Sequence, residues 1–401
     1  MKAGFEFVSS GTITTPDGFT AGATHAGIKK EANLDLAILA SEVPCVAAGV
    51  LTRNQIKAAP VVLCQQRLAG GKAVGVVVNS GCANACTGEQ GLADAREMAA
   101  LAAEAIGAPP EQVLVASTGV IGQMMPMERL RTGIKQISLS RDGGHEMARA
   151  IMTTDTVPKE VAVRVSGGGY TIGGVAKGAG MIHPDMATFL GFLATDARVD
   201  PAFLQSALKQ AADVSFNMVS IDGDTSTNDT LLLLANGLAG NDVISSGTEQ
   251  AEAFQQALDG LCIHLARAMA RDGEGATKLF EVTVRGASDR AAARQMARTV
   301  VSSPLVKAAT YGNDPNWGRI LAAVGRSGAE VVESKVDLYL ADICLLKAGR
   351  PQPFDHAEAV KQLNKTEVAF TLNLNLGDGS AVAWGCDLTE NYAEINSHYT
   401  T

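Results

Sequence analysis

Apolar residues along this chain fall into short continuous runs that alternate with longer stretches of helical spacing. The runs at 46–53, 73–79 and 113–116 are rich in β-branched residues and predict strands. Between the last two, the alanine-rich stretch 92–106 carries apolar residues three and four positions apart and predicts a helix. Residues 229–235 include four consecutive leucines, which predicts a strand buried on both faces.

Two further helices are indicated by their ends. Asp200 precedes Pro201, a pair typical of a helix N-cap and first helical position, and the helix is expected to continue to about residue 214. Residues 249–271 have the spacing of a long amphipathic helix, and Gly273 follows soon after its end.

The pattern changes near Gly286, beyond which we expect a smaller α/β domain. Its expected elements are a helix at 287–301, a strand region at 335–347 and a short helix at 356–363.

The last part of the chain predicts a hairpin. Apolar and polar residues alternate over 368–376, and Gly-Asp-Gly-Ser then turns the chain into 381–387. We therefore interpret 1–286 as a larger layered domain and 287–401 as the smaller one.

The composition is that of an ordinary globular protein. The 401 residues are 46% hydrophobic and 19% charged, and the formal charge of −9 argues against a general nucleic-acid surface. No stretch approaches the ~18 apolar residues that cross a bilayer, and the start has no pattern of a targeting peptide. We expect a soluble cytoplasmic protein with neither nucleic-acid nor membrane partners.

Cysteines and histidines give no metal signature. Seven cysteines are scattered, and the one close pair, Cys82 and Cys86, lacks a second pair to complete a zinc site. Six isolated histidines show no ligand spacing. We expect no metal, and buried reduced thiols. His183 has the chemistry of a base, but we favour a structural role for it.

Thr188 is the candidate nucleophile. It follows the small residue Ala187, after a segment with seven glycines in residues 166–180, and precedes an apolar run. If the chain breaks between these two residues, Thr188 gains an α-amine with a pKa near 8 beside its own hydroxyl, so one residue supplies nucleophile and base. Two alternatives without a catalytic role are a threonine that begins a strand and a flexible surface loop.

Acyl transfer also needs a site for the oxyanion. Thr118 and Gly119 follow the strand expected at 113–116, and a turn there offers a hydroxyl and an unobstructed backbone N–H. The alternative is an ordinary strand-to-loop turn.

The segment from Lys177 to Leu190, Lys-Gly-Ala-Gly-Met-Ile-His-Pro-Asp-Met-Ala-Thr-Phe-Leu, resembles the signature of the ornithine acetyltransferase (glutamate N-acetyltransferase) family. Further segments similar to that family follow in order along nearly the whole chain, among them 79–88, 117–122, 220–229, 272–278 and 311–319. The chain departs from that family's usual residues at Ala179, Asp185 and Cys82.

This resemblance implies an α/β (α+β) fold in which two sheets form a sandwich flanked by helices, the DmpA/ornithine acetyltransferase fold. It also implies self-cleavage between Ala187 and Thr188 into chains 1–187 and 188–401 that stay together as α2β2. By resemblance, Lys177 meets a substrate carboxylate and Glu274 an ammonium group. Thr154, Asn396 and the C-terminal Thr401 complete the pocket.

The implied reaction is a two-step transfer of acetyl from N-acetylornithine to glutamate through an acetyl ester of Thr188, without a cofactor. The sequence leaves open whether acetyl-CoA is a second donor. Two alternatives also stay open: an N-terminal-threonine aminopeptidase or amidase on the same fold, and an uncleaved binding protein.

Overall fold

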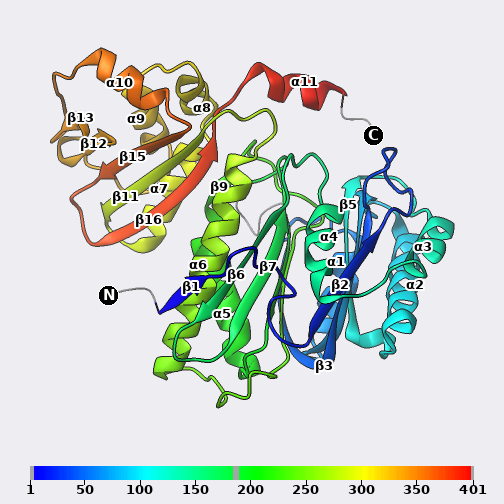
Figure 1. Ribbon diagram of the computed structural model, residues 1–401. Coiled ribbons are helices and arrows are strands. Elements are labelled where there is room, and N and C mark those ends of the chain that lie inside the picture. The colour runs from blue at the N-terminus through cyan, green and yellow to red at the C-terminus, as the bar shows by residue number, and fades with distance from the viewer. Residues whose placement is uncertain (1–3, 184–188, 399–401) are drawn as a thin grey trace.

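The computed structural model describes residues 4–183 and 189–398, which form two sheets and eleven α-helices (Figure 1). The first sheet contains β1 (Phe5–Phe7), β2 (Phe19–Thr24), β3 (Leu36–Leu51), β4 (Lys72–Cys82), β5 (Val113–Val120), β6 (Lys159–Val165), β7 (Thr171–Lys177), β8 (Leu190–Thr195) and β10 (Thr230–Ala235). The second contains β9 (Val219–Ser220), β11 (Leu279–Ala287), β12 (Asp337–Leu340), β13 (Ile343–Lys347), β14 (Arg350–Pro351), β15 (Glu367–Asn373) and β16 (Gly379–Cys386). The helices are α1 (Ala59–Leu68), α2 (Gly88–Ile106), α3 (Met127–Ile134), α4 (Gly144–Ala150), α5 (Pro201–Val214), α6 (Glu249–Arg271), α7 (Arg290–Val301), α8 (Pro304–Tyr311), α9 (Trp317–Gly325), α10 (His356–Leu363) and α11 (Glu390–His398).

The first sheet folds over on itself at β3. The order is β1-β6-β7-β8-β10-β3-β4-β5, and β2 also pairs with β3. Because β2 pairs with the first half of β3 and β10 with the second half, β3 passes from one layer into the other. Its pairing with β4 is irregular between Ala40 and Cys45, which is typical of a bent strand.

The two layers pack face to face. Leu39 of β3 and Val78 of β4 share one buried cluster with Phe192 of β8 and Leu232 of β10. The other face of β10 carries Leu231 and Leu233, which pack in a second cluster with α5 and α6. Alternating leucines therefore enter different cores, and burial of β10 on both faces is confirmed.

Helices cover the outer faces of this sandwich. In Figure 1, α5 and α6 lie over the layer with β6 and β7, and α2 and α3 lie at the opposite side. The expected sheet-on-sheet sandwich flanked by helices is confirmed.

The predicted ends of α5 and α6 are confirmed. Asp200 caps α5, because its carboxylate accepts a 3.0 Å hydrogen bond from the backbone N–H of Phe203. Thr248 caps α6 in the same way through the N–H of Ala251, at 3.1 Å. These local hydrogen bonds satisfy backbone N–H groups that would otherwise lack a partner at both helix starts.

The second sheet has the order β14-β13-β12-β15-β11-β16-β9 and lies at one end of the molecule (Figure 1). The predicted hairpin is wrong in its pairing, although its two strands exist as β15 and β16. β11 lies between them, parallel to β15 and antiparallel to β16. Alternation reports which face of a strand is buried, but it does not identify the partner strand.

The boundary expected after residue 286 falls inside β11. Gly286 (φ +66°) lies where the pairing with β16 shifts register, between Val284 and Ala287, so the glycine marks an irregularity in a strand. By its pairing, β11 belongs to the second sheet, which therefore starts before that boundary. The division into two domains stays a prediction.

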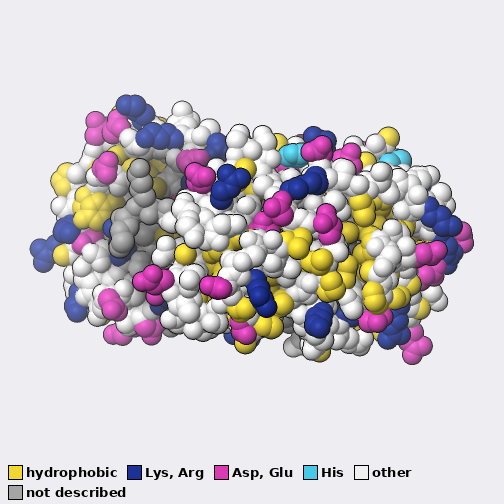
Figure 2. All heavy atoms as spheres, turned by 60° about the horizontal axis from the view of Figure 1, so that its bottom comes forward, with side chains coloured by type: hydrophobic (Ala, Val, Ile, Leu, Met, Phe, Trp, Pro, Cys, Tyr) yellow, Lys and Arg dark blue, Asp and Glu magenta, His cyan; other side chains and the backbone are white. Residues whose placement is uncertain are grey.

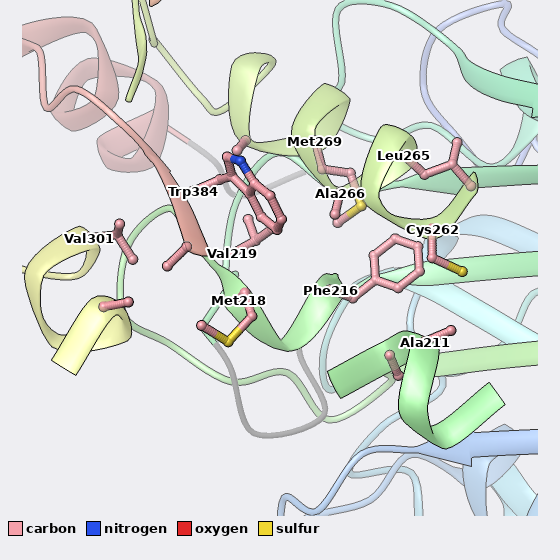
Figure 3. Close-up of a cluster of buried hydrophobic side chains, with 14 of the residues drawn as sticks. Ala211, Phe216, Met218, Val219, Cys262, Leu265, Ala266, Met269, Val301 and Trp384 are labelled. Carbon is pink, nitrogen blue, oxygen red and sulfur yellow. The ribbon is translucent and has the colours of Figure 1, made fainter. Parts of the chain in front are cut away.

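The two sheets are joined at β9, which pairs with β16 through Val219 and Trp384. Figure 3 shows these two side chains beside Met218, which directly precedes β9, and Met269 of α6. All four belong to the cluster that also packs on α5 and α7. One continuous core therefore connects the sandwich with the second sheet.

Along the part of the chain that the structure describes, every helix is too short or too polar to cross a membrane. On the face shown in Figure 2, acidic and basic side chains are interspersed and form no extended basic surface. This distribution fits the formal charge of −9.

Candidate active site

Four strands present one paired row of residues at the edge of the sandwich where β8 begins. Lys177 of β7 pairs with Leu190 of β8, Leu190 with Thr230 of β10, and Thr230 with Leu51 of β3. The backbone N–H of Thr230 also donates to the carbonyl of Phe189 at 3.0 Å. Thr188 directly precedes Phe189 and lies outside the described residues, as do Ala187 and Thr401.

Lys177 is held at this edge as a buried cation. It is 6% exposed, and its Nζ lies 3.4 Å from Oγ1 of Thr118 on β5. Burial lowers the pKa of Lys177, while Asp155, Glu274 and Asp229 oppose the decrease. The structure therefore brings together two residues expected at the site, the carboxylate-binding lysine and the oxyanion threonine.

Thr118 and Gly119 were expected in a turn after the end of a strand. They belong instead to the last part of β5. Parallel pairing with β4 continues to these residues, with Gly81 opposite Gly119. Gly119 has φ +128°, and a Cβ there would lie 2.3 Å from the carbonyl carbon of Gly81. Only glycine fits this position, because both the conformation and the close backbone approach exclude a side chain.

Glu274 and Asn396 come together from distant parts of the chain. Nδ2 of Asn396 on α11 donates a 2.7 Å hydrogen bond to Oε2 of Glu274. The backbone N–H of Glu274 donates to the carbonyl of Ala179 at 2.8 Å, in the loop after β7. A Cβ at Gly180 would lie 2.4 Å from the Glu274 carboxylate, so the glycine permits this close contact.

Thr154 lies in the loop before β6 and lines two cavities. One, of about 640 Å³, is shared with Glu274 and with the loop before α11. The other, of about 860 Å³, is lined by Lys29 and by Gly81, the residue opposite Gly119. Thr154 therefore stands between the Glu274 side of the site and the Gly119 side.

A buried ion cluster that sequence reasoning missed supports these residues. Lys159 is 3% exposed, and its Nζ lies 2.7 Å from Oδ1 of Asp155 and 2.6 Å from Oδ2 of Asp272. Asp155 also accepts from the backbone N–H of Gly178 at 2.7 Å and of Thr153 at 3.0 Å. These bonds link three segments in one cluster. The segments are the loop of Thr154, Gly178 directly after Lys177, and the end of α6, which precedes Glu274.

The cluster stabilises the ionised form of Asp155. Burial acts to raise the pKa of Asp155, but Lys177, Lys159 and the hydrogen bonds outweigh it and lower the pKa to about 2. In the sequence, Asp272 opens the family-like segment 272–278, but nothing there reveals its contact with Lys159 or the place of Asp155 beside them.

The half-buried Lys29 and the buried Asp229 are two further ionisable groups near the site. Burial lowers the pKa of Lys29, on the wall of the larger Thr154 cavity, to about 8. Burial raises the pKa of Asp229, the residue before Thr230, well above its ordinary value. Apolar neighbours in the sequence suggest such burial for Asp229, but nothing in the sequence suggests it for Lys29.

The glycine-rich segment before Thr188 is only partly a loop. Gly173 and Gly174 lie inside the fully buried strand β7. A Cβ at Gly173 would lie 2.2 Å from the carbonyl oxygen of Thr12, and one at Gly174 would lie 2.6 Å from Leu193. These two glycines therefore permit close packing of β7 and do not make a flexible loop.

His183 and the thiols are placed as follows. Nδ1 of His183 lies 3.2 Å from Oγ of Ser220, so its described contact is with a strand residue. Cys82 is buried and Cys86 exposed. Within residues 4–183 and 189–398, no group of three or more histidine, cysteine or acidic side chains is arranged to hold a metal ion.

Comparisons with known proteins match the whole chain. The model of the ArgJ family matches residues 20–401. Arginine biosynthesis bifunctional protein ArgJ of Dehalococcoides mccartyi is 54% identical over 100% of both chains. The protein of the same name from Bacillus subtilis is 45% identical over 98% of this chain and 97% of its own.

A crystal structure of ArgJ from Bacillus halodurans is similar with a TM-score of 0.50 and 44% identity, and covers 51% of this chain and 96% of that one. A family match over nearly all residues, together with such identities along the full length, establishes that this chain belongs to the ArgJ family.

Proposed function

We propose that this chain is a glutamate N-acetyltransferase of arginine biosynthesis, which transfers acetyl from N2-acetylornithine to glutamate and also accepts acetyl-CoA as donor. The observation that carries the proposal is the placement of Lys177 and Glu274. A buried cation and a carboxylate meet at the loop after β7, which leads directly to Thr188.

The charges suit this substrate. N-acetylornithine has a carboxylate at one end and a side-chain ammonium at the other. Lys177 binds the carboxylate, and Glu274, oriented by Asn396, binds the ammonium. Thr154 and Thr401 complete the pocket in this proposal. Glutamate, an α-amino acid of similar length, uses the same carboxylate site in the second step.

The nucleophile arises by cleavage between Ala187 and Thr188, which gives chains 1–187 and 188–401. The length of the Bacillus halodurans chain supports this step. It is matched over 96% of its own length but covers 51% of this chain. Residues 188–401 make up about that share of this chain. After cleavage the α-amine of Thr188 serves as base for its own hydroxyl.

Acetyl transfer then proceeds in two balanced steps. The Thr188 hydroxyl oxygen bonds to the acetyl carbon, the amide C–N bond breaks, and ornithine leaves with the proton that the α-amine passes to its nitrogen. The amine of glutamate next bonds to the acetyl carbon of the ester and the C–O bond breaks. The proton lost by the amine returns to the threonine oxygen through the same α-amine.

Thr118 and Gly119 stabilise the oxyanion of both steps. The 3.4 Å separation between Thr118 Oγ1 and Lys177 Nζ places a cation beside this hydroxyl. One oxyanion donor typically contributes about 3–4 kcal/mol to transition-state stabilisation.

Several wider features belong to the same proposal. Chains 1–187 and 188–401 remain associated as α2β2, and the enzyme acts in the cytoplasm without a cofactor or metal. The aminopeptidase or amidase alternative is disfavoured, because full-length relatives carry the name arginine biosynthesis bifunctional protein.

The test is an assay of acetyl transfer to glutamate, with N-acetylornithine and acetyl-CoA tried separately as donors. Intact-mass measurement of the denatured protein should reveal two chains that meet at 187/188. Thr188→Ala should give one uncleaved chain and no transfer. Hydrolysis of amides without transfer to glutamate would overturn the proposal in favour of the amidase.

A further inference from the structure

A cavity of about 940 Å³ lies between the sandwich and the second sheet, apart from the cavities around Thr154. Its walls come from the end of β3, from α5 and from α7, and Arg326 adds a residue just after α9. His183, five positions before Thr188, also lines it. The cavity therefore reaches the segment that carries the nucleophile.

Positive charge dominates this cavity. Among the described residues that line it, five are cations and one, Asp213, carries a carboxylate. The cations are Arg53, Lys209, Arg294, Arg298 and Arg326. The chain as a whole has a formal charge of −9, so this concentration runs against the overall balance. A cleft lined by one sign of charge focuses its field on a bound ion of opposite sign.

The single carboxylate helps to orient an arginine. Oδ1 of Asp213 accepts from Nη2 of Arg294 at 3.1 Å and from Nδ2 of Asn217 at 3.0 Å. Nε of Arg294 is buried and makes no hydrogen bond with any residue in the described ranges. Arg294 is therefore oriented at the wall through its bond to Asp213.

The cavity continues the row of paired strands at the active site. Leu51 lines the cavity and pairs with Thr230, whose other neighbour is Leu190. Neighbouring strands are about 4.8 Å apart, so the cavity begins roughly 10 Å from the strand that Thr188 precedes. A ligand with a flexible arm can occupy the cavity and extend its reactive end across β10.

We infer that this cavity, called here the cationic cavity, binds the phosphate groups of acetyl-CoA while its pantetheine arm carries the acetyl thioester to Thr188. The inference rests on the proposed function, because it concerns the second acetyl donor. Coenzyme A carries a diphosphate and a 3′-phosphate, and arginine binds such oxygens in a bidentate manner. N-acetylornithine and glutamate have no group that requires five cations, and Lys177 already serves their carboxylates.

The inference can be tested with charge reversals at exposed residues, which leave the fold intact. Lys209 and Arg326 are both exposed. Lys209→Glu and Arg326→Glu should each raise KM for acetyl-CoA more than about tenfold, and KM for N-acetylornithine should stay within about twofold. Arg96→Glu, an exposed change on α2 that does not line the cavity, is the matched control and should alter neither value.

A second comparison removes the phosphates from the donor. Acetyl-pantetheine, which lacks the nucleotide, should be a poor donor for the wild-type protein, and its kcat/KM should not change in either variant. Equal loss with both thioesters would overturn the inference, since the variants would then act on chemistry or folding.

Direct binding separates this inference from the proposed function. Wild-type protein that transfers acetyl from N-acetylornithine, yet neither binds CoA in calorimetry nor uses acetyl-CoA, would overturn the inference and the acetyl-CoA part of the proposed function, and would leave transfer from N-acetylornithine to glutamate intact. Absence of transfer from either donor would overturn the proposed function, and tight CoA binding that Lys209→Glu abolishes would still support the cavity assignment. Binding of inorganic phosphate that CoA does not displace would assign the cavity to free phosphate and overturn the inference.

Discussion

Asn396 donates a 2.7 Å hydrogen bond to Glu274, although 122 positions separate the two residues in the chain. This bond fixes the C-terminal helix α11 against the loop that follows α6. Glu274 in turn touches Gly180, three residues after Lys177. The expected ammonium site is thus assembled from three segments, and the C-terminal segment contributes to it.

The first prediction concerns this hydrogen bond. Asn396→Ala removes a donor to a carboxylate, and hydrogen bonds to charged groups contribute about 1.5–3 kcal/mol. We expect KM for N-acetylornithine to rise by about tenfold or more, with a smaller change in kcat. Steady-state kinetics at saturating glutamate measures both constants.

Ser397→Ala is the matched control, because Ser397 is the next residue of α11 and, among the described residues, its hydroxyl donates to the carbonyl of Glu394 in the same helix. Its kinetics should equal those of the wild type. Equal effects of both substitutions would indicate a general loosening of α11 and would contradict the specific role of Asn396.

The second prediction separates the hydroxyl of Thr118 from its bulk. Thr118→Ala should lower kcat about 10²–10³-fold, because it removes a proposed oxyanion donor. Thr118→Ser keeps the hydroxyl and should recover most of this loss. Single-turnover formation of the acetyl-enzyme measures the step directly, and a fully active alanine variant would exclude the donor role.

Local signals in the sequence were sufficient for many of the elements. Helix α6 has the predicted ends, and α5 starts at the predicted proline, because capping and spacing are encoded within a few residues. The hairpin predicted for β15 and β16 is wrong because the strand between them, β11, comes about 80 residues earlier in the chain. Sequence spacing cannot reveal such an insertion.

The site shows the same limit. Motifs indicated Lys177, Glu274 and Asn396, but the cluster of Asp155, Lys159 and Asp272 forms only when β6 and the end of α6 meet. The cationic cavity was missed for a similar reason. Its five cations come from four separate parts of the chain, so no run of basic residues announces them.

The third prediction concerns thiol reactivity. Cys86 is exposed, whereas Cys45 and Cys64 are buried and burial raises their pKa values to about 12 and about 11. Iodoacetamide should therefore label Cys86 first in the native protein, and Cys45 and Cys64 only after denaturation. Peptide mass spectrometry over a time course measures the order, and early labelling of Cys45 would contradict the described burial.

The fourth prediction concerns acid stability. The pKa of Asp155 is lowered in the folded protein to about 2, as Lys177 and Lys159 outweigh the effect of burial. A carboxyl whose pKa is lower in the folded state stabilises the fold above its unfolded pKa, near 4. That contribution, on the order of 2 kcal/mol, is lost as the pH falls from about 4 to 2.

Asp155→Asn should remove this pH-dependent contribution and also leave Lys159 and Lys177 with less compensation. We expect the free energy of unfolding at pH 7 to fall by about 3–5 kcal/mol, as when one partner of a buried ion pair is removed. The slope of stability between pH 4 and 2 should also become shallower in the variant. Urea denaturation across that range measures both effects. Asp378→Asn, at an exposed turn, is the control and should leave the pH profile of stability unchanged. An unaltered pH profile in Asp155→Asn would show that the ion cluster does not stabilise the fold.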